Sequence, residues 1–297
     1  MAAVPPDPTV QRRRLRAELR KARDAALRKQ AEVAAAMEWS PSKLMRIESG
    51  QVSISTNDLR ALLTYYGVKD KVQVNRLVDL ARSTRGASFY DQYSDVLKQG
   101  FKEYLAYEAS ASVVRQYEPV LLPGLLQTEE YGRAILEQAI GWGSELADKA
   151  WAVRQHRQEI HDRDAPPDML FVIDEAAVRR NVGKGHTMLH QLERLREHAE
   201  QPHVSLQVLP FSRGAHPGMT GSFVMLEFAD ATLDDMVHLE SVNEITIRDD
   251  TDVISRYLDK FHQLEELALS PEESTVLLEK IIQEASANSA RAEKVAS

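Results

Sequence analysis

The chain has 297 residues, of which 43% are hydrophobic, and it contains no cysteine. This length suggests about two domains, and the hydrophobic fraction excludes a wholly disordered chain. Without cysteine there is no disulfide, no zinc–thiolate site and no cysteine nucleophile. The chain begins without an apolar signal core, and no apolar run approaches the ~20 residues of a membrane helix. We therefore expect a soluble, cytoplasmic protein.

The net charge of −8 is divided unevenly along the chain. Residues 1–86 hold 17 Lys and Arg against nine Asp and Glu, whereas residues 87–297 hold 20 against 36. A basic segment followed by an acidic one is typical of a nucleic-acid-binding domain joined to a domain that does not bind nucleic acid. A solvated basic helix is the alternative, because the run Gln11–Arg16 alone supplies half of the surplus.

The first part of the chain predicts a bundle of five short helices. Residues 1–10 contain three prolines and no periodicity, which predicts a flexible arm. Residues 11–84 then carry apolar residues at three- and four-residue spacing, which is typical of amphipathic helices. The expected helices lie near residues 15–26, 30–37, 41–49, 57–66 and 71–82.

The third of these helices has the clearest boundaries. Ser40 is a good N-cap, Pro41 is suited to the first helical position, and Gly50 can adopt the left-handed conformation that ends a helix. Leu44 and Ile47 would face the core. A short helix after a tight turn, with small polar and basic residues on its outer side, describes a helix-turn-helix. A generic five-helix bundle remains the alternative.

The outer residues of this third helix suit the major groove of DNA. The Arg46 guanidinium can bond both acceptors of a guanine edge, which discriminates by about 1–3 kcal/mol. Ser42 is a permissive reader, and Lys43 is a point charge that positions more than it specifies. The arginines of the first helix either add phosphate contacts or are simply solvated; they are Arg12, Arg13, Arg14, Arg16 and Arg20.

Residues 11–68 resemble the Xre-type helix-turn-helix of phage-repressor-like regulators, in particular its actinobacterial branch. The matching residues are Gln30, Val33-Ala34, Trp39-Ser40-Pro41-Ser42-Lys43, Arg46-Ile47-Glu48-Ser49-Gly50 and Asp58-Leu59-Arg60-Ala61-Leu62-Leu63. The resemblance implies a DNA-binding surface made of Gln30, Ser40, Pro41, Ser42, Lys43, Arg46 and Ser49. In it Gln30 and Ser49 touch phosphate, whereas Pro41, Ser42 and Arg46 face base edges. The chain departs from the family at Leu27-Arg28-Lys29, where the hydroxyl cap of the second helix is lost.

Residues 85–286 predict an α+β domain in which helices surround a small, mostly antiparallel sheet. The fold class is thus mainly α with an α+β C-terminal domain. We expect strands near 111–117, 169–173, 204–209, 222–228, 236–240 and 245–248. Ser270-Pro271-Glu272-Glu273 predicts a capping box at the start of the last helix. Residues 287–297 predict a flexible tail.

This larger domain shows no catalytic motif, and we expect neither an enzyme nor a bound cofactor or metal. His186 and His190 have a spacing that can hold a metal, but no third ligand is evident, and two surface histidines are the simpler interpretation. The Pro- and Gly-rich segment 209–221 is longer than a hairpin needs. Its residues either form a ligand or partner loop or serve only as a connection; they are Arg213, His216, Pro217, Gly218 and Met219.

Several motifs of this domain resemble the uncharacterised C-terminal domain of WhiJ-like actinobacterial regulators. They are Tyr117-Glu118-Pro119, Pro123-Gly124-Leu125-Leu126-Gln127-Thr128-Glu129, Asp174-Glu175-Ala176, Val208-Leu209-Pro210-Phe211, Gly214-Ala215-His216-Pro217-Gly218-Met219 and Leu269-Ser270-Pro271-Glu272-Glu273-Ser274. The resemblance implies a transcriptional regulator, usually a repressor, of development or secondary metabolism. It also implies control by a small partner protein of the BldB type.

Three hypotheses follow. The first is a homodimeric repressor that binds a double-stranded DNA operator, since one helix-turn-helix reads few base pairs and operators mirror two-fold symmetry. The second is an antitoxin-like protein that mainly holds a small partner and binds DNA only to regulate itself. The third is a regulator that senses a small molecule.

Overall fold

The structure, a computed structural model, describes residues 7–296 apart from residues 140, 142, 185 and 242–243. Its internal contacts divide the chain into two compact units. Unit 1 extends to Gln92 and includes the short segment Asp230–Asp234, and unit 2 comprises Tyr93–Ala229 and Asp235–Ser297. Each unit has its own hydrophobic core.

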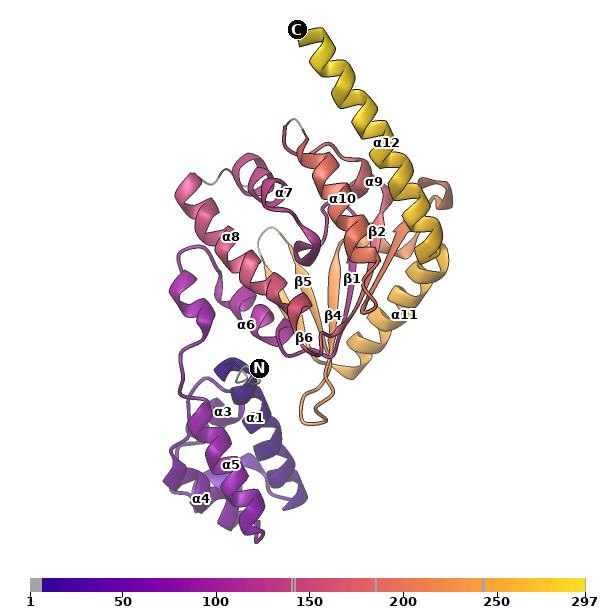
Figure 1. Ribbon diagram of the computed structural model, residues 1–297. Helices are drawn as coiled ribbons and strands as arrows, with labels where there is room; N and C mark the ends of the chain where they lie inside the picture. The colour runs from indigo at the N-terminus through magenta and orange to yellow at the C-terminus, as the bar shows by residue number, and fades with distance from the viewer. Residues whose placement is uncertain (1–6, 140, 142, 185, 242–243, 297) are drawn as a thin grey trace. The chain divides into compact units, whose positions relative to one another are not determined.

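Unit 1 is helical, as the sequence predicts (Figure 1). Its helices are α1 (Pro8–Ala25), α2 (Gln30–Ala36), α3 (Pro41–Glu48), α4 (Thr56–Tyr65) and α5 (Lys71–Ser83), followed by the 3₁₀ turn η1 (Phe89–Tyr93). One face of each helix contributes to a shared core, and the fully buried leucines of that core are Leu19, Leu44, Leu59, Leu62, Leu63 and Leu77. The bundle positions α3 with its opposite face toward solvent.

The first helix begins earlier than the sequence analysis predicts. The Asp7 carboxylate caps α1 by accepting a hydrogen bond from the Thr9 N–H at 2.8 Å, and Pro8 occupies the first turn. These are strong helix-start signals, since proline loses no hydrogen bond there. The prediction of a flexible arm is therefore wrong for residues 8–10, while residues 1–6 lie outside the described residues.

Unit 2 is built on one six-stranded sheet, and all six predicted strands are confirmed. The strands are β1 (Val113–Glu118), β2 (Asp168–Asp174), β3 (Val204–Leu209), β4 (Phe223–Glu227), β5 (Met236–Glu240) and β6 (Ile245–Arg248), in the order β3-β2-β1-β4-β5-β6. The β1·β2 and β2·β3 pairs are parallel, and the other three are antiparallel. The sheet is therefore mixed, and β1, β2, β3 and β5 all end at one edge.

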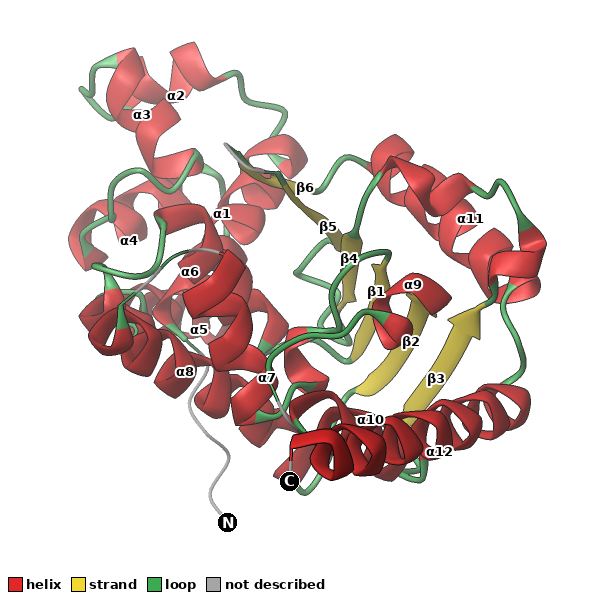
Figure 2. Cartoon of the chain, turned by 90° about the horizontal axis from the view of Figure 1, so that it is seen from above, coloured by secondary structure: helices red, strands yellow, loops and turns green. Residues whose placement is uncertain are grey.

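Helices cover both faces of this sheet (Figures 1 and 2). One face packs against α11 (Thr251–Leu267) through a cluster that includes Tyr117, Phe223 and Phe261. The other lies under α6 (Gln99–Glu108), α7 (Glu129–Ala134), α8 (Ser144–Gln158) and α10 (Thr187–Ala199). Shorter elements complete the unit: η2 (Gly124–Leu126), η3 (Ile135–Ala139), η4 (Glu159–Asp162), α9 (Glu175–Arg179), η5 (Phe211–Arg213) and η6 (Pro217–Thr220).

The last helix, α12 (Pro271–Ala296), starts at the predicted capping box. The Glu273 N–H donates to the Ser270 hydroxyl at 3.1 Å, and the Ser270 N–H donates to the Glu273 carboxylate at 2.9 Å. This reciprocal pair satisfies two N–H groups that the helix leaves free. The helix continues to Ala296, so the predicted flexible tail 287–297 is helical up to that residue.

Candidate nucleic-acid interface

The turn between α2 and α3 forms a helix-turn-helix. The Trp39 N–H donates to the Ala34 carbonyl at 2.8 Å and the Glu38 N–H to the Ala35 carbonyl at 3.1 Å, which closes the end of α2. Glu38 adopts a positive φ of 55° to make this turn, although it is not a glycine. Buried side chains from both helices, Val33 of α2 and Ile47 of α3 among them, then join the same core.

Helix α3 is capped as its sequence predicts. The Ser40 hydroxyl accepts a hydrogen bond from the Lys43 N–H at 3.3 Å, and Pro41 occupies the first helical position. The Ser40 and Ser42 hydroxyls lie 3.1 Å apart. At the other end Gly50 has a φ of +78°, and a Cβ there would lie 2.6 Å from the Arg16 side chain. Both ends of α3 are therefore fixed by local chemistry.

One face of α3 is left open to solvent. Leu44, Ile47 and Glu48 are buried. Pro41, Ser42, Met45 and Arg46 are exposed, and Ser49 follows at the end of the helix, partly buried. Ser42, Met45, Arg46 and Ser49 are separated by three, four and seven residues, so they share one face. The sequence analysis omitted Met45, which the same spacing places beside Arg46. A methionine there can pack against the methyl group of thymine.

Arg46 is the unpaired basic side chain of this face. The structure gives its guanidinium no hydrogen bond or ion pair with any described residue, and the side chain is exposed. A guanidinium offers five N–H donors in a planar fork, which matches the two acceptors of guanine in the major groove. Because the guanidinium is hydrated, the lack of a protein partner costs little free energy.

Lys43, in contrast, is engaged within the bundle. Its ammonium group lies 3.1 Å from the Asp58 carboxylate of α4 and 4.1 Å from the centre of the Trp39 ring. The two charged side chains are each about 40% exposed. Lys43 thus fastens α3 to α4 and to the turn, and a phosphate contact would have to compete with Asp58.

Gln30 is exposed, but its side chain is bound to the buried carboxylate of Glu48. Its amide donates to the Glu48 carboxylate at 2.7 Å, and Arg23 donates to the other oxygen of Glu48 at 2.9 Å. Burial lowers the pKa of Arg23, but the hydrogen bond and charge of Glu48 outweigh burial and raise it overall. Glu48 therefore orients both partners, and the exposed Gln30 amide keeps a second N–H for an outside acceptor.

The arginines of α1 make contacts within the protein, so they are not simply solvated, while the interpretation as phosphate contacts stays a prediction. Most of them donate to backbone carbonyls, several at helix ends where such groups lack partners. The acceptors are the carbonyls of Thr84 for Arg12, Asp234 for Arg13, Ser49 for Arg16 and Glu48 for Arg20. Arg16 and Arg20 thus satisfy the C-terminal end of α3 and hold it against α1.

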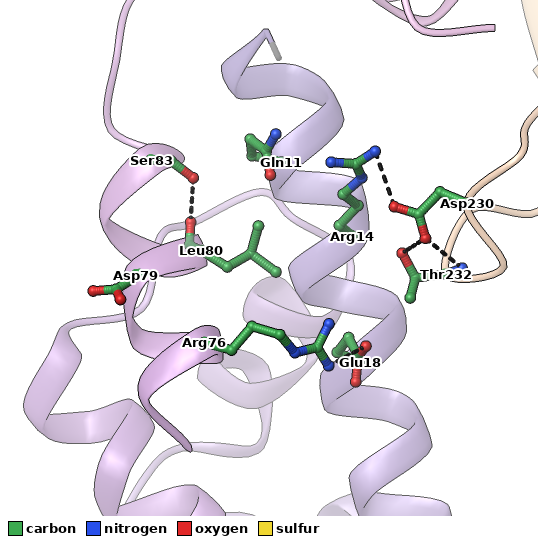
Figure 3. Close-up of a pocket in the computed structure, with 9 residues that line it drawn as sticks. All are labelled: Gln11, Arg14, Glu18, Arg76, Asp79, Leu80, Ser83, Asp230 and Thr232. Atoms are coloured by element: carbon green, nitrogen blue, oxygen red, sulfur yellow. Dashed lines mark hydrogen bonds and ion pairs between the residues drawn. The ribbon is translucent and has the colours of Figure 1, made fainter. Parts of the chain in front are cut away.

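Unit 1 also contains a pocket of about 320 Å³ (Figure 3). Within it Arg14 pairs with Asp230 at 2.9 Å and Arg76 with Glu18 at 2.7 Å. Burial would raise the pKa of Asp230, but hydrogen bonds from Thr232 and the charges of Arg14 and Arg76 lower it. The basic groups of this pocket are matched by acidic ones, and we assign it no ligand.

The predicted ligand or partner loop of unit 2 has residues in different environments. His216 is buried, with its Nε2 atom 3.4 Å from the Asp174 carboxylate, and Gly218 lies against the Tyr117 ring. Arg213 donates to the Leu267 carbonyl at 2.8 Å. Pro217 begins η6, and Met219 is 69% exposed. The loop is therefore anchored at three points, and Met219 and Phe211 are exposed apolar residues of the segment.

His186 and His190 have rings 6.1 Å apart on the first turn of α10. Within the described part of the chain, no group of three or more His, Asp or Glu side chains is arranged to hold a metal ion. Nor does any described helix combine the length and apolar character that crossing a membrane requires.

Comparison with known proteins yields two family matches. A helix-turn-helix domain matches residues 14–77, which include α2, the turn and α3. A domain of unknown function (DUF5753) matches residues 101–280, more than half of the chain, so the protein belongs to this family. No curated protein and no solved structure matches the chain. The helix-turn-helix match and the open face of α3 together make this chain a DNA-binding regulator of transcription.

Proposed function

We propose that the protein is a sequence-specific transcriptional repressor that binds its operator through the exposed face of α3. The observation that carries this proposal is the unpaired, exposed guanidinium of Arg46 at the centre of that face. Ser42 and Met45 lie beside it at helical spacing, and Gln30 supplies an N–H for a flanking phosphate. The Ser49 hydroxyl donates to the Arg46 carbonyl at 3.2 Å and would have to turn to reach phosphate. Arg46 reads base edges, whereas Lys43 holds α3 in position.

The repressor acts as a homodimer in this proposal. One α3 helix contacts only a few base pairs, and two copies related by a two-fold axis would read two half-sites about one helical turn apart. Light scattering of the purified chain measures the oligomeric state, and footprinting measures the half-site spacing. A monomer that protects one half-site would contradict this part of the proposal.

Unit 2 receives the signal that controls DNA binding. Support comes from the motifs that resemble WhiJ-like actinobacterial regulators, a resemblance that suggests a small partner protein of the BldB type. The outward-facing Met219 of the anchored loop offers an apolar contact for such a partner. Co-purification of the full chain with a neighbouring small protein, compared between the natural chain and Met219→Ser, tests this assignment.

The central experiment is fluorescence anisotropy of the full chain on DNA from upstream of its own gene. A scrambled duplex is measured beside it at two salt concentrations, because phosphate contacts weaken steeply with salt. We expect the upstream duplex to be preferred by about a thousandfold or more. Weak binding that disappears equally for both duplexes would contradict a sequence-specific regulator.

The Arg46→Ala variant tests whether α3 is responsible for the preference for the upstream duplex. Loss of a guanine contact worth about 1–3 kcal/mol predicts a roughly 5- to 150-fold weaker complex with the upstream duplex and nearly unchanged binding to the scrambled one. Arg82→Ala is the matched control, since Arg82 is an exposed arginine of α5 that pairs with Asp79. Equal losses on both duplexes for Arg46→Ala would show that Arg46 contacts phosphate and does not read sequence.

A further inference from the structure

Helix α3 carries one apolar side chain that the core of unit 1 does not use. Leu44 and Ile47 are buried in that core, whereas Met45 between them is 58% exposed. Met45 is also not one of the described residues that pack against the core from its margin. Its side chain therefore adds little to the stability of the bundle and is available to a partner outside the chain.

The place of Met45 on α3 gives this exposure a meaning. Single exposed apolar residues are common on protein surfaces, and unit 1 has others outside α3, namely Leu27, Val72 and Phe89. Met45 instead lies on the open face of α3, where successive residues point about 100° apart. By this spacing Met45 lies at one side of the face, Arg46 at the other, and Ser42 and Ser49 between them. The face therefore has an apolar side and a cationic side.

The C5 methyl group of thymine is the apolar group that the major groove of DNA presents. No other base carries a methyl group there, so an apolar contact at this point distinguishes thymine from the other three bases. The side chain of methionine is unbranched and polarizable, and it adapts to the shape of an apolar partner. Contact between Met45 and a thymine methyl group would remove both from water, which favours the complex.

The distance between Met45 and Arg46 limits which thymine is contacted. The Cα atoms of adjacent residues are about 3.8 Å apart, and stacked base pairs are about 3.4 Å apart. The two side chains leave the helix in different directions, so they reach different base pairs. Because their starting points are about one base-pair step apart, these base pairs lie within two positions of each other.

We propose that Met45 selects thymine in the operator by packing against its C5 methyl group, within two base pairs of the guanine that Arg46 contacts. The inference rests on the proposed repressor function, because it requires α3 to lie in the major groove. It adds to that function a specificity-determining residue and a feature of the DNA that it recognises. The contact carries no charge, so its contribution does not change with salt, in contrast to phosphate contacts.

The test is fluorescence anisotropy of the full chain on upstream duplexes in which each thymine is replaced in turn by deoxyuridine. Deoxyuridine pairs like thymidine and lacks only the methyl group. We expect at least one replacement to weaken the complex by about three- to fivefold, the effect of one buried methyl group, and equally at both salt concentrations. Replacing each guanine by 7-deazaguanine, which lacks the N7 acceptor, locates the guanine that Arg46 contacts. The sensitive thymine should lie within two base pairs of it.

Two variants decide whether Met45 makes the methyl contact. Met45→Ala changes an exposed residue to a good helix former, so the bundle should remain folded. This variant should bind the thymine duplex more weakly than the natural chain and should no longer distinguish thymine from deoxyuridine at the sensitive position. Val72→Ala, which shortens an exposed apolar side chain of α5, is the matched control and should keep the natural sensitivity.

The outcomes separate this inference from the repressor proposal. If the natural chain prefers the upstream duplex but no deoxyuridine weakens binding, the inference is overturned and the repressor proposal stands. The same holds if Met45→Ala keeps the full sensitivity to deoxyuridine. If the natural chain shows no preference for the upstream duplex, the repressor proposal is contradicted, and the thymine contact with it.

Discussion

The two units place an unpaired arginine side chain in opposite environments. In unit 1 the buried carboxylate of Glu48 is matched by Arg23 and Gln30, and the unpaired guanidinium of Arg46 stands in water on α3. In unit 2 an unpaired guanidinium, that of Arg154, has buried nitrogens. The first arrangement leaves a bundle whose buried charges are paired and whose α3 face is free to bind a partner. The second leaves polar atoms of the interior without a hydrogen bond.

This difference separates two kinds of unpaired charge, one hydrated and one with buried atoms. An exposed guanidinium is stabilised by water until DNA replaces that water, so unit 1 does not need DNA in order to fold. The Nε and Nη1 atoms of Arg154 are buried, so water does not take the place of a protein partner at these two atoms. The comparison would be wrong if removing the buried charges of unit 1 left its stability unchanged. It would also be wrong if the stability of unit 2 did not depend on the charge of its buried groups.

The largest expected effect concerns the paired charge of unit 1. Glu48→Ala leaves the Arg23 guanidinium, whose side chain is 17% exposed, with only the exposed Asp24 carboxylate at 2.9 Å, and it frees the Gln30 amide. Removing one partner of a buried ion pair destabilises by about 3–5 kcal/mol. Native-state hydrogen exchange of the α2 and α3 amides measures this loss in the full chain.

The matched control for Glu48→Ala is Asp79→Ala. Asp79 pairs with Arg82 on α5, but the two side chains are 71% and 62% exposed. An exposed pair contributes about 0.5 kcal/mol or less, so exchange should hardly change. If both variants had the same small effect, the buried network would not hold α3 in place, and the contrast with unit 2 would disappear.

The next effect tests the buried histidines of unit 2. His198 of α10 is 2% exposed, and its Nδ1 lies 3.3 Å from the Gln201 oxygen. The centre of its ring lies 4.6 Å from that of the tilted His161 ring. Burial, then the charges of His161 and Arg194 and later that of His203, lower the pKa of His198 to about 4. The folded protein thus keeps His198 neutral where the unfolded chain takes up a proton.

The sign of the pH dependence follows from this lowered pKa. The neutral form of His198 contributes its full stabilisation above the ordinary histidine pKa of about 6.5. This contribution, on the order of 3 kcal/mol, is lost as the pH falls through the pKa of the folded state. His198→Gln should therefore flatten the fall in unfolding free energy between about pH 6.5 and 4. His190→Gln, at an exposed position on the same helix, should leave the natural slope. Parallel slopes for all three chains would refute a neutral, buried His198.

Local signals predicted the elements of this fold well. Ser40, Pro41 and Gly50 delimit α3, and the Ser270 capping box starts α12, because caps depend on neighbours a few residues away. The predicted arm is wrong over residues 8–10 because its prolines were taken as helix breakers, whereas Asp7 and Pro8 begin a helix.

The partners of charged residues could not be predicted in the same way. Arg23 meets Glu48 25 residues away, and Arg157 meets Glu108 49 residues away. Nothing in the spacing of α8 distinguishes Arg157, which finds this carboxylate, from Arg154, which finds none. The exposed face of α3 could be predicted because helical spacing alone defines it, whereas the position of Arg154 beside Gly132 depends on how α7 packs against α8.

The smallest expected effect concerns the turn that positions α3. Glu38 is exposed, its side chain has no partner among the described residues, and its φ is 55°. A residue with a Cβ is disfavoured in this left-handed region by about 1 kcal/mol, and glycine is not. Glu38→Gly should therefore stabilise unit 1 by roughly 0.5–1 kcal/mol, since the greater freedom of glycine in the unfolded chain offsets part of the gain.

Two substitutions separate the backbone effect at Glu38 from the loss of its charge. Glu38→Ala removes the same carboxylate but keeps a Cβ, so hydrogen exchange in α2 and α3 should show little gain. Glu32→Gly makes the same change inside α2, where glycine is unfavourable by about 1 kcal/mol and a hydrogen bond to the Lys29 N–H is also lost. Opposite signs for the two glycine variants would place backbone strain at the turn itself. Equal gains for Glu38→Ala and Glu38→Gly would instead assign the effect to charge, and the α2–α3 turn would then be unstrained.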